Sequence, residues 1–122
     1  MKNEYRTLSQ RLKRVLNAGL FSKRGFVAAW RHEAAFRDEL LLCLVGLPVI
    51  VLSSTSKYEK LALGLTLLAV LIVELLNSAI EAIVDLVSPD HHELAGRAKD
   101  LGSAAVGLAL CAAALTWAFV LL

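Results

Sequence analysis

A run of polar side chains interrupts the apolar stretch between residues 74 and 88 at helical spacing. At about 100° per residue, these side chains fall within an arc of about 100° on one face of a helix, and apolar residues cover the rest. Charged groups in apolar surroundings cost free energy unless they are paired, so this stripe predicts a function. The stripe consists of Glu74, Asn77, Ser78, Glu81, Asp85 and Ser88.

Three members of the stripe carry groups suited to catalysis or metal binding. Carboxylate and amide oxygens are hard ligands of the kind that Mg²⁺ takes from proteins, together with phosphate oxygens. A carboxylate can also accept a proton from an attacking hydroxyl group. We therefore interpret Glu74, Asn77 and Glu81 as functional, and Ser78 and Asp85 as groups that bond to neighbouring helices or reach water.

The segment that follows the stripe carries charges suited to phosphates. Acidic and histidine side chains at residues 90–93 precede Arg97, Lys99 and Asp100. Catalysis of phosphoryl transfer consists mainly of positioning and charge neutralisation, which such residues can provide. The sequence therefore predicts phosphoryl transfer, although it contains neither a P-loop motif nor a Rossmann glycine motif.

The composition indicates that a membrane surrounds these residues. The chain of 122 residues is 57% apolar, with a mean hydropathy of +0.63, yet 20% of it is charged. A soluble domain of this length has too small an interior for so much apolar surface, and disordered chains are poor in apolar residues. Nine basic residues precede the first long apolar run, and their attachment to it favours a membrane surface over nucleic acid as partner.

Three apolar segments are long enough to cross a bilayer, which takes roughly 20 helical residues. Residues 101–122 form a run of 22 residues without a charge. The other spans are expected at about 38–56, with a bend at Pro48, and at 61–87, where Pro89 ends a helix that projects beyond the bilayer. We therefore expect an all-α membrane protein with a single domain over residues 1–122.

Residues 1–37 are expected to form a surface region on the cytoplasmic side. Leucines recur there at helical spacing among basic residues, as in an interfacial helix, and Gly25 is expected to interrupt this helix. Glu33 can pair with Arg37 at i, i+4. Eleven of the 13 Lys and Arg residues fall on the side of the N-terminus and the second loop, which predicts a cytoplasmic N-terminus and an external C-terminus.

Three longer motifs add a resemblance to a known family. They are EAAFRDE at residues 33–39, VELLNSAIEA at 73–82, and HELAGRAKD with GSAA within 92–105. With these motifs, its size, a basic N-terminal helix and three spans, the chain resembles the prokaryotic diacylglycerol kinases over essentially its full length. The resemblance implies a small homotrimeric enzyme of the bacterial inner membrane, which transfers the γ-phosphoryl group of MgATP to diacylglycerol and gives phosphatidic acid.

The resemblance also implies roles for single residues. Glu74 would be the general base toward the lipid hydroxyl, Glu33 and Glu81 would hold the metal ion, and Asn77 is expected to fix the stripe by hydrogen bonding. A close relative has a tyrosine at the position of Phe21, and Phe21 lacks the hydroxyl group of that tyrosine. The positions that match nucleotide contacts are Arg14, Phe21, Glu33, Glu81, Asp90, His91, His92, Lys99 and Asp100. Those that match the lipid-contacting region are Arg14, Ala18, Ser22, Trp30, Ala35, Arg37, Glu39, Glu74 and Ser103.

Two other functions are alternatives at this point. Undecaprenol kinases of the same family share the ExxNxxxE core, but the EAAFRDE and GSAAV stretches favour the diacylglycerol type. A small transporter or channel subunit would line an ion path with the acidic stripe, but it leaves Lys99 and the histidine pair unexplained. Self-association is expected on physical grounds, because three thin helices cannot surround a polar stripe, whereas the trimer follows only from the resemblance.

Overall fold

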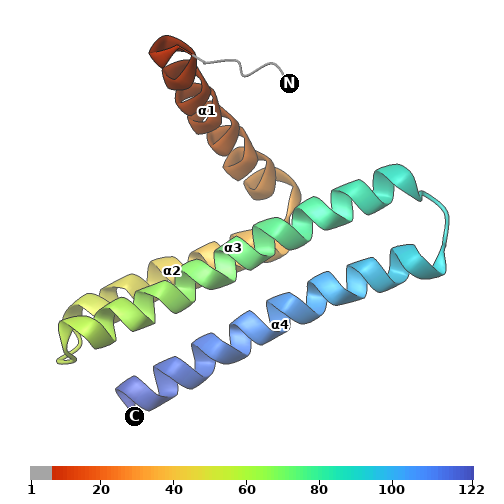
Figure 1. Cartoon of the computed structure of the whole chain (residues 1–122). Coiled ribbons are helices and arrows are strands. Elements are labelled where there is room, and N and C mark those ends of the chain that lie inside the picture. Colours follow the sequence, from red (N-terminus) through yellow and green to blue (C-terminus); the bar gives the residue numbers. More distant parts are fainter. Residues whose placement is uncertain (1–6) are drawn as a thin grey trace.

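The computed structural model describes residues 7–122, and within them the chain is helical apart from short connections (Figure 1). The helices are α1 (Leu8–His32), α2 (Ala34–Leu52), α3 (Lys57–Val87) and α4 (Glu93–Leu121). Two residues of the basic N-terminal region, Lys2 and Arg6, lie outside the described part. The all-α class that the sequence predicted is confirmed for residues 7–122.

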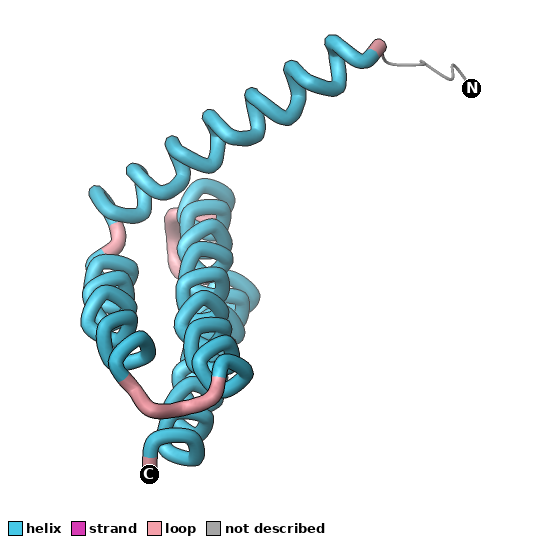
Figure 2. The backbone as a smooth tube through the Cα atoms, turned by 90° about the vertical axis from the view of Figure 1, so that its left-hand side faces the viewer, coloured by secondary structure: helices cyan, strands magenta, loops and turns pink. Residues whose placement is uncertain are grey.

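The last three helices form an elongated bundle, and α1 leaves it at a steep angle (Figures 1 and 2). α3 packs along α4 and, over part of its length, along α2. With 31 residues against 19, α3 is longer than α2 by about 18 Å. The C-terminal part of α3 and the start of α4 therefore extend past the elbow between α1 and α2 (Figure 1).

Side-chain caps account for where the helices begin. Thr7 starts α1 and Ser56 starts α3, each in a capping box that a Gln or Glu three residues later completes. Nδ1 of His92 accepts a hydrogen bond from the backbone N–H of Leu94 at 3.1 Å and so caps α4. The N-termini of these helices thus have their first free N–H groups satisfied locally.

The break predicted at Gly25 is wrong, because α1 runs unbroken to His32. A glycine inside a helix costs only about 1 kcal/mol relative to alanine, which neighbouring helical residues can outweigh. The chain turns instead at Glu33, whose φ of −115° and ψ of 105° are extended. One residue therefore forms the elbow between α1 and α2.

Arg37 holds this elbow closed from the α2 side. Its Nη1 donates hydrogen bonds to the carbonyl oxygens of Trp30 at 2.8 Å and Arg31 at 3.4 Å. These carbonyls belong to the last turn of α1 and lack helical partners, so a cation there is favourable. The expected ion pair between Glu33 and Arg37 is not formed within residues 7–122, since the guanidinium is engaged by the end of α1.

The apolar core lies in the half of the bundle distant from the elbow. Leu63 and Val70 of α3 are fully buried, and Cys43 and Ile50 of α2 pack in the same region. Nε1 of Trp117 donates a hydrogen bond to Oγ1 of Thr66 at 3.1 Å, which links α4 to α3. This packing fixes α3 between its two neighbours.

Within the described residues, two helices, α3 and α4, are long and apolar enough to span a membrane, each with a mean hydropathy of 2.2 over its best segment. α2 has too short an uncharged stretch to count with them. Arg37, Asp38 and Glu39 lie near its start and leave only 13 uncharged residues at 40–52. The accessible surface is 9480 Å². A compact protein of this mass exposes roughly 6,400 Å², so large apolar faces of the single chain need lipid or protein to cover them.

Candidate active site

The predicted polar stripe divides into a buried part and an exposed part. Glu74 is 4% exposed and Asn77 is 8% exposed, which is unusual for such groups. Glu81 is half-buried, whereas Asp85 is exposed and pairs with Lys99 of α4. The stripe thus leads from the interior of the bundle to its exposed projecting end.

Asn77 makes the hydrogen bond that the sequence led us to expect. Its Nδ2 donates to Oε1 of Glu81 at 3.4 Å, one turn further along α3. Its Oδ1 is buried and has no hydrogen-bond partner among residues 7–122. The amide lies against the backbone of α4 at Gly102, where even a Cβ atom would overlap it. The donor end of the amide therefore faces Glu81 and its acceptor end faces α4.

Four carboxylates gather where the elbow meets the middle of α3, and we call them the carboxylate cluster: Glu33, Glu39, Glu74 and Glu81. The carboxylates of Glu33 and Glu81 lie close enough to Glu74 for their negative charges to interact with it electrostatically. Glu74 interacts in the same way with Glu39. Oε2 of Glu39 is buried, and no group in the described part of the chain forms a hydrogen bond with it. Within residues 7–122 no Lys or Arg side chain forms an ion pair with any of the four. The cluster is therefore an acidic site that holds no ion-paired cation within residues 7–122.

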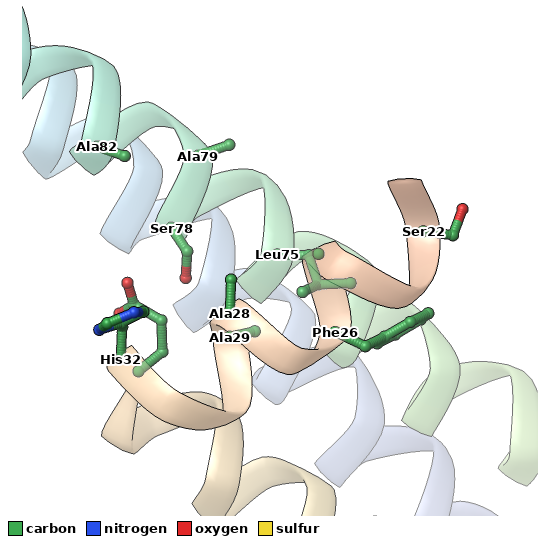
Figure 3. Close-up of a pocket in the computed structure, with 11 residues that line it drawn as sticks. Ser22, Phe26, Ala28, Ala29, His32, Leu75, Ser78, Ala79 and Ala82 are labelled. Carbon is green, nitrogen blue, oxygen red and sulfur yellow. The ribbon is translucent and has the colours of Figure 1, made fainter. Parts of the chain in front are cut away.

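A groove of about 590 Å³ opens beside the cluster, between the end of α1 and the C-terminal half of α3 (Figure 3). Glu33, His32 and Ser22 line it from the α1 side, and Ser78 lines it from α3. Alanines on both helices leave the space open. Ser22 was expected to contact lipid, but His32 was missed, because nothing but its position next to Glu33 singled it out.

The cationic side of the site comes from the start of α4. Lys99 is half-buried, forms an ion pair with Asp85, and is close enough to Glu81 to interact with its charge. Asp100 is exposed on the same turn. The loop residues that match nucleotide contacts, Asp90, His91 and His92, are exposed at the far end of the α3–α4 pair.

The α1 residues that match nucleotide and lipid positions lie away from the cluster. Arg14, Ala18 and Phe21 are exposed on the part of α1 that projects from the bundle (Figure 1). The Phe21 ring lies under the Arg24 guanidinium at 5.9 Å, and Oγ of Ser22 donates to the Ala18 carbonyl. The single chain therefore does not bring these side chains to Glu74.

The remaining lipid-matching positions surround the elbow or lie on α4. Trp30 and Ala35 are exposed on either side of Glu33. Arg37 donates its hydrogen bonds to carbonyl oxygens of α1, and Glu39 is buried in the carboxylate cluster. Ser103 is exposed one residue after Gly102. Four of the nine positions for which lipid contact was expected, Trp30, Ala35, Arg37 and Glu39, thus lie at or next to the elbow.

The donor set suits a magnesium ion that also binds phosphate. No group of three His, Cys, Asp or Glu side chains is placed to hold a metal by itself within residues 7–122. Mg²⁺ commonly takes one or two carboxylates and completes its shell with water and phosphate oxygens, so a complete protein cage is not needed. Glu33 and Glu81 fit this requirement. Both are half-buried, and both are close enough to Glu74 to interact electrostatically with it.

Comparison with known proteins agrees with this chemistry. A family model described as prokaryotic diacylglycerol kinase matches residues 20–121. A diacylglycerol kinase of Pseudomonas aeruginosa is 52% identical over 111 residues, which cover 91% of this chain and 90% of the relative. The diacylglycerol kinase of Escherichia coli K12 is 43% identical over 88% of both chains. That of Haemophilus influenzae is 38% identical over 90% of this chain and 93% of the relative.

Proposed function

Because this chain belongs to the prokaryotic diacylglycerol kinase family, it is a kinase that phosphorylates diacylglycerol, and we propose that the carboxylate cluster is where it does so. The product is phosphatidic acid. The observation that carries the proposal is the burial of Glu74 beside Glu33 and Glu81 without an ion-paired cation among residues 7–122, since buried charges are ordinarily paired. Such an arrangement suits a site that is completed by a proton and a metal–nucleotide complex.

Glu74 is proposed as the general base. The primary hydroxyl oxygen of diacylglycerol attacks the γ-phosphorus of ATP, a new O–P bond forms, and the bond to the β,γ-bridging oxygen breaks. The hydroxyl proton passes to the Glu74 carboxylate, and ADP leaves with the bridging oxygen. A base must lie within hydrogen-bond reach of its proton, and the buried position of Glu74 keeps water from competing for it.

Glu33 and Glu81 are proposed to hold Mg²⁺ on the nucleotide. When bound, the ion neutralises charge that develops on the phosphates. Asn77 keeps Glu81 in place through its amide, and Lys99 is near enough to Glu81 to share in neutralising the phosphates. Arg14, Phe21, the loop at 90–92 and Asp100 are proposed nucleotide contacts.

The lipid is proposed to reach Glu74 from the side of the elbow. Trp30 suits the headgroup level of a bilayer, and the groove beside Ser22 provides space next to Glu33. The cluster lies where the apolar part of α2 ends and its charged first turns begin. A hydroxyl group at the membrane surface would therefore meet the cluster without leaving the headgroup region.

The membrane arrangement is part of the same proposal. α2 is proposed as a third span beside α3 and α4, in the bacterial inner membrane, with the N-terminus cytoplasmic and the C-terminus outside. The exposed apolar faces support self-association, since a second copy can cover surface that one chain leaves open. A homotrimer is proposed on the family resemblance alone.

A substrate comparison tests this function. The purified full-length protein, in detergent–lipid micelles, should phosphorylate dioleoylglycerol when ATP and Mg²⁺ are both present. Undecaprenol offered under the same conditions should react far more slowly. A preference for undecaprenol would overturn the assignment of substrate, and ion flux into liposomes without ATP turnover would overturn the assignment as a kinase.

A further inference from the structure

Near the site, Asn77 of α3 lies directly against Gly102 of α4. Gly102 is buried, and a Cβ atom built there would overlap Oδ1 of Asn77 and crowd its Cγ. Real Cβ atoms never sit so close to another atom. Any residue other than glycine at position 102 must therefore push the Asn77 side chain aside or move α4 away from α3.

The contact also determines which way the Asn77 amide points. Oδ1 is buried and accepts no conventional hydrogen bond from the residues that the structure describes, and the hydrogen that takes the place of a side chain on Gly102 points at it. A Cα–H group is a weak donor that helix–helix contacts often use. Nδ2 lies on the other side and donates to Oε1 of Glu81. With the amide reversed, two acceptor oxygens would face each other at Glu81.

We propose that Gly102 is a positioning residue of the active site: its missing side chain lets α4 hold the Asn77 amide with its donor toward Glu81. The inference rests on the proposed function, because it assumes that Glu81 holds the metal–nucleotide complex. Nothing in the sequence motif itself gives this role to Gly102, since the contact exists only where α3 and α4 pack.

The test is the substitution Gly102→Ala in the full-length enzyme. Binding is measured with Mn²⁺ as a spectroscopic probe, by electron paramagnetic resonance, in the presence of a non-hydrolysable ATP analogue. We expect Mn²⁺ affinity to fall at least fivefold and kcat with dioleoylglycerol to fall about tenfold or more, because small misplacements of catalytic groups have effects of that size.

Gly107→Ala is the matched control. Gly107 lies on the same helix, and a Cβ atom there meets nothing within 4 Å. The Mn²⁺ affinity and the kcat of Gly107→Ala should both stay within twofold of the parent values. Parent-like Mn²⁺ affinity and activity in Gly102→Ala would overturn the proposal.

A double substitution shows whether Gly102 acts through Asn77. When Asn77→Ala has removed the amide, adding Gly102→Ala should weaken Mn²⁺ binding no further, because the two changes concern one contact. An equal additional loss in that background would overturn the proposal. If Gly102→Ala alone does not fold, Asn77→Ala with Gly102→Ala should restore the folded oligomer, and failure to do so would also overturn it.

Glu81→Ala separates this inference from the proposed function. It should weaken Mn²⁺ binding whatever Gly102 does. If Glu81→Ala has no effect, the metal assignment fails. If Glu81→Ala weakens binding and Gly102→Ala does not, only the role of Gly102 fails.

Discussion

Nη1 of Arg37 lies 2.8 Å from the carbonyl oxygen of Trp30 and so ties the second helix to the end of the first. Glu33 is the only residue between those helices, and it forms one wall of the groove beside the carboxylate cluster. The hydrogen bond therefore fixes the angle of the elbow and, through it, the position of a proposed metal ligand. For Arg37, the family resemblance had suggested contact with lipid and not this structural role.

Replacing Arg37 should loosen the elbow. A hydrogen bond from a charged donor contributes about 1.5–3 kcal/mol, so Arg37→Ala is expected to destabilise the fold by about that amount and to raise the Mg²⁺ requirement. Limited proteolysis in micelles, read at the peptide bonds next to Glu33, measures the loosening. Arg24→Ala serves as the control, because Arg24 is exposed and its guanidinium lies over the Phe21 ring of the same helix, away from the elbow bond. Cleavage as slow in Arg37→Ala as in the control would contradict this account of the elbow.

Removing either proposed metal ligand should change metal dependence before anything else. Glu33→Ala and Glu81→Ala are each expected to raise the half-saturating Mg²⁺ concentration about tenfold or more, because one of few protein ligands is lost. A Mg²⁺ titration at fixed ATP measures this. Asp38→Asn removes an exposed carboxylate from the same region and should leave the titration unchanged. An unchanged titration in both glutamate variants would exclude them as ligands.

The link between Trp117 and Thr66 should contribute to stability and not to catalysis. Trp117→Phe removes the hydrogen bond between α4 and α3 and is expected to lower the free energy of unfolding by about 1 kcal/mol or more, since part of the ring is lost as well. Turnover per folded enzyme should stay within twofold of the parent. Thermal unfolding followed by circular dichroism, with the assay run on the same sample, separates the two quantities. A large fall in turnover at an unchanged free energy of unfolding would contradict a purely stabilising role for this hydrogen bond.

Lys99 and Asp85 should behave differently although they form one ion pair. Both side chains are substantially exposed, so the pair should add little to stability and both variants should unfold near the parent temperature. Lys99→Met is expected to raise KM for ATP, because it removes a cation close to Glu81. Asp85→Asn should leave KM within twofold, since Lys99 keeps its charge. Equal effects of the two substitutions on KM would show that the pair itself, not the lysine, matters.

Local patterns made several parts of the fold predictable. Helical periodicity placed Glu74, Asn77 and Glu81 on one face, and the structure buries Glu74 and Asn77 and joins Asn77 to Glu81. The run of uncharged residues after Leu101 predicted a long final helix. These features depend on residues a few positions apart, which is why the sequence alone sufficed.

Features that depend on packing were not predictable in the same way. Gly25 has the residue type of a helix break, yet the chain turns at Glu33, where Arg37 stabilises the bend through carbonyls of the preceding helix. The approach of Gly102 to Asn77 arises only when α3 and α4 lie side by side. No spacing rule within one helix contains that information.

The proposed phosphoryl transfer depends most on Glu74 as the proton acceptor, and Glu74→Gln tests this role most directly. The variant keeps the size of the side chain and removes the base, so we expect purified protein to form no phosphatidic acid from dioleoylglycerol while still binding ATP with nearly the parent affinity. Glu59→Gln, at the opposite end of α3, can keep its capping bond and should remain active. Phosphatidic acid formed by Glu74→Gln at a rate close to that of the parent would contradict the assignment.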